Sequence, residues 1–190
     1  MVRTKEFDEN AVLLKGMRLF WDQGYEKTSM QELVSHMGIH KGSMYDTFGD
    51  KRSLYIKALK HYSASLEQSY KLRMVGLSAK EAIRMLFERA IYPGEESPLG
   101  CFIVNTAIEL AKHDSEARDC VHQFWHYTEQ LMRDLIIEGQ QSGEISKVLN
   151  AEWLSQYLNN ALIGLRVMVK TIRDREKLLQ IIEVNMSVIN

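Results

Sequence analysis

Residues 28–54 read TSMQELVSHMGIHKGSMYDTFGDKRSL, and this stretch predicts two short helices joined by a tight turn and followed at once by a third helix. Ser29 is placed to cap the first helix, and Glu32 lies three positions further on, which is the spacing of a capping box. Gly38 ends that helix where a left-handed residue is favoured, and Ile39 fills the turn.

The second short helix is expected over about residues 40–47, with Met44 and Phe48 forming its apolar side. Its other side is polar and carries His40, Lys41, Ser43, Tyr45 and Thr47. This layout is typical of a helix-turn-helix, whose second helix enters the major groove of DNA. Taken alone, the polar side is equally consistent with an ordinary solvated helix face.

The helix that follows is capped by Asp50 and has Lys51 and Arg52 in its first turn. Cations at this end oppose the helix dipole, and a nearby phosphate would compensate for them.

From Gly38 to Leu54 the chain resembles the DNA-binding pattern of the TetR family of bacterial transcriptional regulators (TetR/AcrR type). The matching residues are Gly38, Ile39, Lys41, Gly42, Ser43, Met44, Tyr45, Phe48, Asp50, Lys51 and Leu54. The resemblance implies an all-α fold of about nine helices, with an N-terminal three-helix DNA-binding domain and a C-terminal helical domain for ligand binding and dimerisation. We place the first domain at residues 1–50 and the second at 51–190, with a connecting helix at 50–72.

Within this pattern we expect most of the polar side of the second helix to contact DNA. Side chains able to reach base edges are those of His40, Lys41 and Thr47, while Gly42 allows close backbone approach. Phosphate contacts, which fix position without reading sequence, are expected from Thr28, Ser29, Tyr45 and Lys51, with Ser43 on the same face.

Composition supports a globular helical protein with a separate DNA-binding part. Of the 190 residues, 45% are hydrophobic and 26% charged, and the formal net charge is -1. Residues 1–62 hold ten Lys and Arg against eight Asp and Glu, which leaves fourteen against seventeen for the rest. With two cysteines and no signal-like or membrane-length apolar run, we expect no disulfide scaffold, no membrane association and a bacterial cytoplasmic location.

The remaining segments also read as helices, bounded by caps and by glycine or proline. A basic arm at 1–6 carries Arg3 and Lys5, for which solvation is slightly favoured over DNA contact, and 92–98 reads as a linker. Helices are expected at about 8–23, 79–91, 99–112, 115–141, 151–170 and 175–190.

Large aromatics and a few polar groups in the body suggest a small-molecule pocket, with a satisfied core as the alternative. The candidates are Phe102, Asn105, Thr106, Glu109, His122, Trp125, His126 and Glu129. His122 and His126 have metal-ligand spacing, but no second cluster accompanies them, so we predict no metal and no cofactor.

Cys101 follows Gly100 at the start of an apolar helix, a position at which a thiol can become reactive. Some relatives with a similar start to this helix respond to oxidants or electrophiles, so Cys101 is a candidate redox sensor. An inert core thiol is the more frequent case.

The last two helices carry more apolar surface than one chain needs. Pairing with the same helices of a second chain would cover it, whereas the alternative is packing on the preceding helices. The interface candidates are Trp153, Tyr157, Ala161, Gly164, Leu165, Ile181 and Ile182.

Together with the resemblance, these observations favour a homodimeric DNA-binding repressor that binds a palindromic operator; the resemblance further implies release by a small-molecule or electrophile inducer. The alternatives are a non-DNA-binding helical adaptor or small-molecule-binding protein, and a helical enzyme. An enzyme is disfavoured because the sequence has no nucleophile elbow, phosphate-binding glycine loop or zinc motif.

Overall fold

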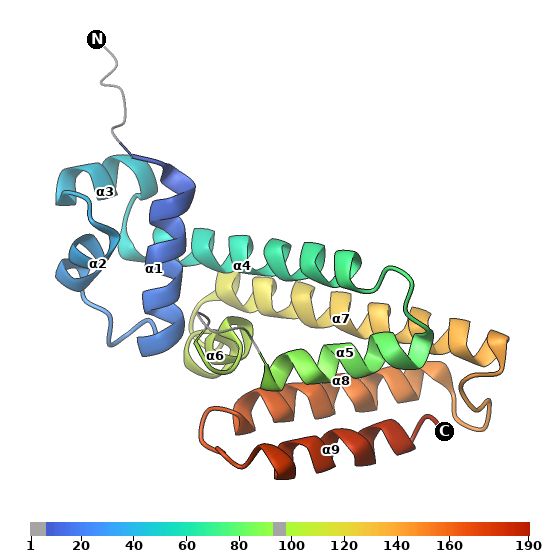
Figure 1. The fold of residues 1–190 in the computed structure, drawn as a ribbon. Coiled ribbons are helices and arrows are strands. Elements are labelled where there is room, and N and C mark those ends of the chain that lie inside the picture. The colour runs from blue at the N-terminus through green and yellow to red at the C-terminus, as the bar shows by residue number, and fades with distance from the viewer. Residues whose placement is uncertain (1–6, 93–97) are drawn as a thin grey trace.

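All regular structure in the described residues, 7–92 and 98–190 of this computed structural model, is helical, which confirms the predicted fold class (Figure 1). Arg3 and Lys5 of the predicted arm, and most of the predicted linker, lie outside the described residues. The helices are α1 (Glu9–Gln23), α2 (Met30–Met37), α3 (Lys41–Phe48), α4 (Lys51–Arg73), α5 (Ala79–Ile91), α6 (Phe102–Glu109), α7 (Ser115–Ser142), α8 (Ala151–Met168) and α9 (Arg175–Ser187).

Most helix starts are set by the caps that the sequence predicts. Ser29 and Ser78 both form complete capping boxes, with Glu32 and Glu81 respectively. Each cap satisfies backbone N–H groups that have no partner within the helix. Carboxylate or amide caps begin the other well-predicted helices: Asp8, Asp50, Asp114, Asn150 and Asp174.

The helix predicted at 99–112 is shorter than expected, because α6 begins only at Phe102. Gly100 has a left-handed backbone (φ +86°), and a Cβ there would lie 2.9 Å from Lys170 Cγ and 3.1 Å from the carbonyl oxygen of Arg166. The segment before Cys101 therefore packs closely on α8 in a conformation that a helix cannot adopt.

The first three helices and the start of α4 pack around buried side chains that are continuous with the core of the body. Phe20, Leu33, Met44 and Leu54 come from the four helices in turn, and each is completely buried. Since burying one such side chain is worth about 1.5–3 kcal/mol, these contacts hold the two short helices in a fixed orientation.

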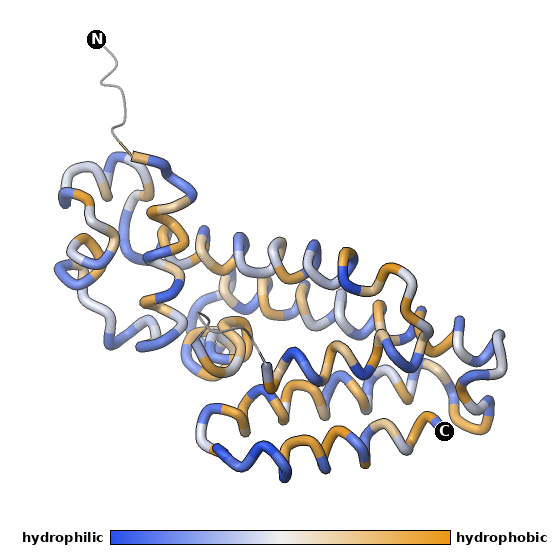
Figure 2. Tube along the Cα trace, in the orientation of Figure 1, coloured by the Kyte–Doolittle hydropathy of each residue, from blue (hydrophilic) through white to orange (hydrophobic). Residues whose placement is uncertain are grey.

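The body consists of α5, α7, α8 and α9, with α4 lying along α7 (Figure 1). The hydropathy of the trace shows apolar stretches on α5, α8 and α9 (Figure 2). Helix α6 crosses between the first three helices and the body, so it is placed to transmit a change of position from one to the other.

Candidate nucleic-acid interface

Helices α2 and α3 are joined by a turn that fixes the angle between them. Gly38 adopts the left-handed conformation (φ +71°), and its N–H reaches the carbonyl oxygens of Val34 and Ser35 at 3.1 and 3.2 Å. The N–H of Ile39 also donates to Val34, at 3.2 Å. The last carbonyls of α2 are thus satisfied before α3 begins, as predicted from the glycine.

Helix α3 has one buried side and one polar outer side. Met44 is completely buried and Phe48 is 5% exposed, so these two side chains anchor the helix. The outer side carries exposed Lys41 and Tyr45, whose side chains have no hydrogen-bond or ion-pair partner in the described part of the chain. His40, Ser43 and Thr47 complete this side: His40 is exposed and the two hydroxyl residues are half-buried.

Gly42 lies on the same outer side, in the first turn of α3. A Cβ added at Gly42 would meet nothing within 4 Å, and its backbone is not left-handed. The fold therefore does not require glycine at this position, although glycine lowers helix stability by about 1 kcal/mol relative to alanine. Glycine at this position would allow the backbone of α3 to approach another molecule closely.

The residues predicted to contact phosphate differ in their exposure. The Thr28 side chain is completely buried and donates to the carbonyl oxygen of Gly24 at 2.6 Å, so the prediction that its hydroxyl binds phosphate is wrong. Ser29 is exposed and caps α2. Lys51 lies at the start of α4, with its Nζ 4.2 Å from the centre of the Tyr25 ring.

Two charged residues beside this surface were missed or misjudged from the sequence. Asp46 is exposed on α3 and would be a hydrogen-bond acceptor for a base amino group. Arg52 does not face a phosphate, because it forms a two-bond ion pair with Asp114, at 2.5 and 3.0 Å. Its charge ties α4 to the start of α7.

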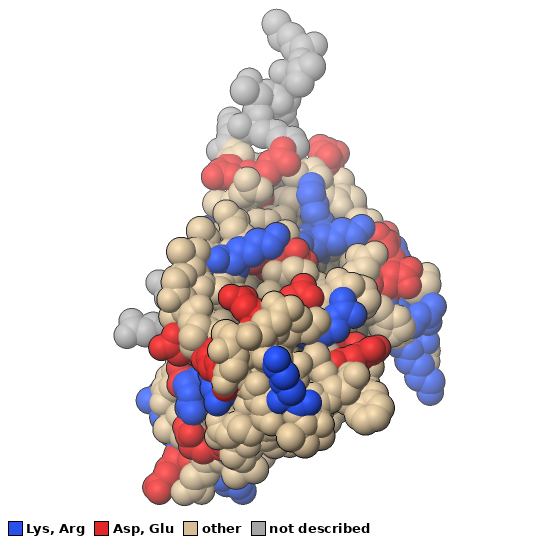
Figure 3. Space-filling model, turned by 90° about the vertical axis from the view of Figure 1, so that its right-hand side faces the viewer, with Lys and Arg blue, Asp and Glu red and all other residues tan. Residues whose placement is uncertain are grey.

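The far end of the body offers no comparable surface. Figure 3 shows that end, and its basic and acidic side chains are interspersed without a single-sign patch. The face seen there gives no sign of a surface suited to a polyanion.

Three residues predicted to bind a ligand instead connect α6 to the DNA-binding helices. The Glu109 carboxylate accepts from the backbone N–H groups of Tyr25 and Glu26 at 2.9 and 2.8 Å. Asn105 donates from Nδ2 to the Trp21 carbonyl oxygen at 3.1 Å, and the Thr106 hydroxyl lies 2.8 Å from that of Tyr55. The polar groups of these three side chains therefore stabilise contacts between α6 and other segments of the same chain.

The other predicted ligand residues are divided between the core and the surface of α7. Phe102 is completely buried in the core, between Tyr55 and Tyr62. On α7, His122 and His126 are exposed, and Trp125 and Glu129 are half-buried. No group of His, Cys, Asp or Glu among the described residues is arranged to hold a metal ion.

A cavity does exist, but it lies between α1, α4, α5, α8 and the start of α6. Its volume is about 180 Å³. It is lined by Trp21, Tyr62, Ser65, Leu66, Ser69, Tyr70, Arg89, Ala90, Gly100, Cys101 and Arg166. Of the predicted body residues, Cys101 alone lies on it. A signal was present in the sequence, since Arg166 interrupts an otherwise apolar band.

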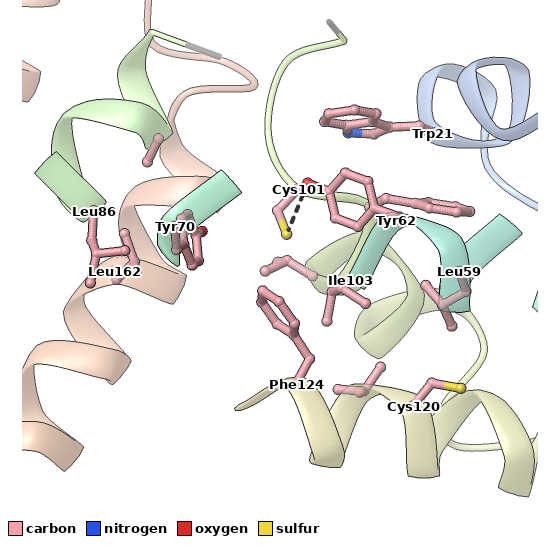
Figure 4. Close-up of a cluster of buried hydrophobic side chains, with 14 of the residues drawn as sticks. Trp21, Leu59, Tyr62, Tyr70, Leu86, Cys101, Ile103, Cys120, Phe124 and Leu162 are labelled. Carbon is pink, nitrogen blue, oxygen red and sulfur yellow. Dashed lines mark hydrogen bonds between the residues drawn. The ribbon is translucent and has the colours of Figure 1, made fainter. Parts of the chain in front are cut away.

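Polar groups reach this cavity from segments that are distant in the sequence, and Figure 4 shows Trp21, Tyr62 and Cys101 among them. Arg166 is 5% exposed and donates from Nη2 to the Tyr70 hydroxyl oxygen at 2.6 Å. The Tyr62 hydroxyl donates to the sulfur of Cys101 at 3.6 Å. The indole Nε1 of Trp21 is buried and has no acceptor among the described residues.

The side chain of Arg166 stays charged although it is buried beside the cavity. Burial by itself lowers the pKa of Arg166, but the neighbouring Tyr70, Cys101 and Tyr62 outweigh it, so its pKa lies above the ordinary value. Burial also raises the pKa of Tyr62 well above its ordinary value. The guanidinium is therefore cationic and the Tyr62 phenol neutral at physiological pH.

The outer face of α8 and α9 is apolar and uncovered. Trp153 is 70% exposed, Tyr157 45% and Val184 65%. Ala161 and Ile181 are half-buried beside them, and a Cβ at Gly164 would meet nothing within 4 Å. Leu165 and Ile182 are buried inside the chain, so the prediction that they contact a partner is wrong.

None of the helices in the described part of the chain combines the length and apolarity needed to cross a membrane.

Comparison with known proteins gives matches in both halves of the chain. A sequence profile described as "Bacterial regulatory proteins, tetR family" matches residues 12–58, and one described as "Tetracyclin repressor-like, C-terminal domain" matches residues 79–184. The HTH-type transcriptional regulator YezE of Bacillus subtilis (strain 168) is 32% identical over 194 residues, covering 100% of both chains. The HTH-type transcriptional repressor ComR of Escherichia coli (strain K12) is 26% identical, covering 94% of this chain and 87% of ComR.

Among solved structures, a cysteine mutant of the TetR family transcriptional regulator CifR, complexed with 26 bp of double-strand operator DNA, is similar with a TM-score of 0.87. The two sequences are 27% identical, and the match covers 99% of this chain and 100% of the CifR chain.

Proposed function

Because this chain belongs to the TetR family of bacterial regulatory proteins, we propose that it works as a homodimeric repressor that leaves its operator when an inducer enters the body. The chain is a DNA-binding transcriptional regulator and not an enzyme. In this proposal residues 1–50 bind DNA in the bacterial cytoplasm, while residues 51–190 dimerise and bind the inducer.

The observation that carries the proposal is the outer side of α3. Lys41 and Tyr45 are held outward by the buried Met44, without partners in the described chain. Two copies of α3 in a dimer would meet successive major grooves, about 34–36 Å apart, so the operator would be a palindrome.

Substitutions at Lys41 and Lys51 should distinguish recognition of DNA bases from binding of phosphates. We expect Lys51→Ala to weaken binding to operator and random DNA alike, and to reduce the salt dependence of binding. We expect Lys41→Ala or His40→Ala to change the preference between the two DNAs as well. Gel shifts on DNA upstream of the gene and on a random duplex measure this, and unchanged binding in all three variants would refute the assignment.

An electrophile is one form that the inducer could take. Cys101 lines the cavity, but its side chain is 2% exposed, so reaction there requires entry into the cavity. If Cys101 is a sensor, N-ethylmaleimide should release operator from the wild type and from Cys120→Ser, but not from Cys101→Ser. Alkylation of Cys101 that leaves operator binding intact would exclude this form of induction.

A further inference from the structure

The cavity that Cys101 lines is built from hydrogen-bond donors. Arg166 is buried and uses one guanidinium nitrogen on Tyr70, and no other described residue accepts a hydrogen bond from its remaining N–H groups. Tyr70 accepts that bond, so its own hydroxyl proton is free to be donated. The Nε1 of Trp21 is a third buried donor, and it has no acceptor among the described residues.

The described lining of the cavity contains no Asp or Glu. A buried cation usually has an anionic partner, because removing its hydration is costly unless another charge compensates. Among the described residues, the neighbours of the Arg166 guanidinium are the phenols of Tyr70 and Tyr62, the thiol of Cys101 and the Phe124 ring, whose centre lies 5.9 Å away. The described lining of the cavity therefore supplies no carboxylate to the buried guanidinium.

We propose that this cavity binds a small monocarboxylate, held by the guanidinium of Arg166, and that this acid is the inducer. The planar guanidinium offers two parallel N–H donors, which match the two oxygens of a carboxylate. Leu66, Ala90 and the Trp21 ring give the cavity its apolar wall. A volume of about 180 Å³ suits an acid with a compact apolar body, such as a benzoate, rather than a long chain.

The position of the cavity connects an occupant to the DNA-binding helices. Trp21 belongs to α1, and its carbonyl oxygen is held by Asn105 of α6. Tyr62 and Tyr70 belong to α4, whose first turn follows α3 directly. An acid that contacts α1 and α4 together would favour one relative position of these helices over another. This regulatory step rests on the proposed function, whereas binding of the acid does not.

Sodium benzoate is the probe, with benzamide as its neutral counterpart of the same shape and inorganic phosphate as a non-carboxylate anion. Isothermal titration of the full-length protein without DNA should show benzoate binding at least roughly tenfold more tightly than benzamide or phosphate. Arg166→Met should abolish this preference. Arg118→Gln, which removes an exposed arginine from α7, should keep it.

Two further variants keep the test decisive if Arg166→Met does not fold. Arg166→Lys retains the charge without the paired donors and should bind benzoate roughly tenfold more weakly. Tyr70→Phe removes the hydroxyl that positions Arg166 and should weaken benzoate binding severalfold. Equal binding of benzoate and benzamide, no benzoate binding to the wild type, or unchanged affinity in both variants would overturn the proposal.

Measuring the release of operator DNA distinguishes a failure of the proposed ligand class from a failure of the proposed repressor function. Benzoate should dissociate a fluorescent operator duplex from the wild type but not from Arg166→Lys at the same concentration. Tight operator binding with no benzoate binding would refute the ligand class and leave the repressor function standing. Benzoate binding by a protein that ignores DNA would refute the repressor function instead.

Discussion

At the scale of a single residue, Gly42 is a position where the requirements of the fold differ from those of DNA binding. Its backbone is an ordinary helical one, and a Cβ there would meet open space. Gly100 is the opposite case, because its left-handed backbone and its contacts with α8 require glycine for the fold itself. Two glycines that are indistinguishable in the sequence thus have different physical causes.

We therefore predict that Gly42→Ala makes the protein more stable and a weaker DNA binder. Removing glycine from an α-helix should raise the free energy of unfolding by about 0.5–1 kcal/mol. The added methyl group should keep the backbone of α3 from the DNA and weaken operator binding by about tenfold or more. Urea unfolding and fluorescence anisotropy measure the two effects, and an unchanged operator affinity would show that no DNA approaches this position.

Residue roles could be predicted from the sequence where they depend on local spacing. Met44 and Phe48 had to face inward because they are four apart in a short helix, which leaves Lys41 and Tyr45 outside. Thr28 was assigned wrongly because its hydroxyl bonds within a loop whose path the sequence does not give.

Among the elements, α6 is the one whose role was furthest from the prediction. Its helical pattern was readable, but its polar residues looked like pocket residues. Their partners lie on α1, in the loop after it and on α4, more than 50 positions away in the sequence. The cavity escaped prediction for the same reason, since Trp21, Tyr70 and Arg166 meet only in the folded chain.

We expect the Glu109 carboxylate to make the strongest of the interactions that hold α6 against the DNA-binding helices. Glu109→Gln replaces two charge-assisted bonds, to the N–H groups of Tyr25 and Glu26, with at most one neutral acceptor for both. We expect a loss of about 1–2 kcal/mol in the free energy of unfolding and weaker operator binding. Glu129→Gln on α7 is the matched control, and equal effects of the two changes would remove this role for Glu109.

The ion pair between α4 and α7 predicts how stability depends on pH. The hydrogen bond from Arg52 lowers the pKa of Asp114 below its ordinary value of about 3.9. A carboxyl whose pKa is lowered in the folded state contributes stability above its unfolded pKa, and this contribution is lost as the pH falls through the folded value.

Asp114→Asn should therefore destabilise the protein at pH about 7, by about 1 kcal/mol or less because Arg52 is largely exposed. The asparagine can still cap α7, so the change isolates the charge. The difference from the wild type should shrink at acid pH, below the ordinary carboxyl pKa value of about 3.9. Urea unfolding at both pH values measures this, and a difference that does not change with pH would contradict the assignment.

At the scale of the whole molecule, the outer face of α8 and α9 decides whether two copies of α3 act together. Trp153 and Val184 are both more than half exposed, which is unusual for large apolar side chains. In the middle of the same face, Gly164 leaves open space above the helix backbone. Close approach of a second chain would use that space, as the apolar pattern of the two helices led us to expect.

Gly164→Glu tests this arrangement without disturbing the fold of one chain. A Cβ at position 164 meets nothing within 4 Å in its own chain, and glutamate favours the helix over glycine, so the chain should stay folded. In a dimer the charge would be buried against the partner at a cost of several kcal/mol. We expect sedimentation equilibrium to show a dimer for the wild type and for the exposed-site control Gln130→Glu, but a monomer for Gly164→Glu. The monomeric variant should also bind operator more weakly, because a single half-site holds the protein weakly. A Gly164→Glu protein that remains dimeric and binds operator normally would show that the interface lies elsewhere.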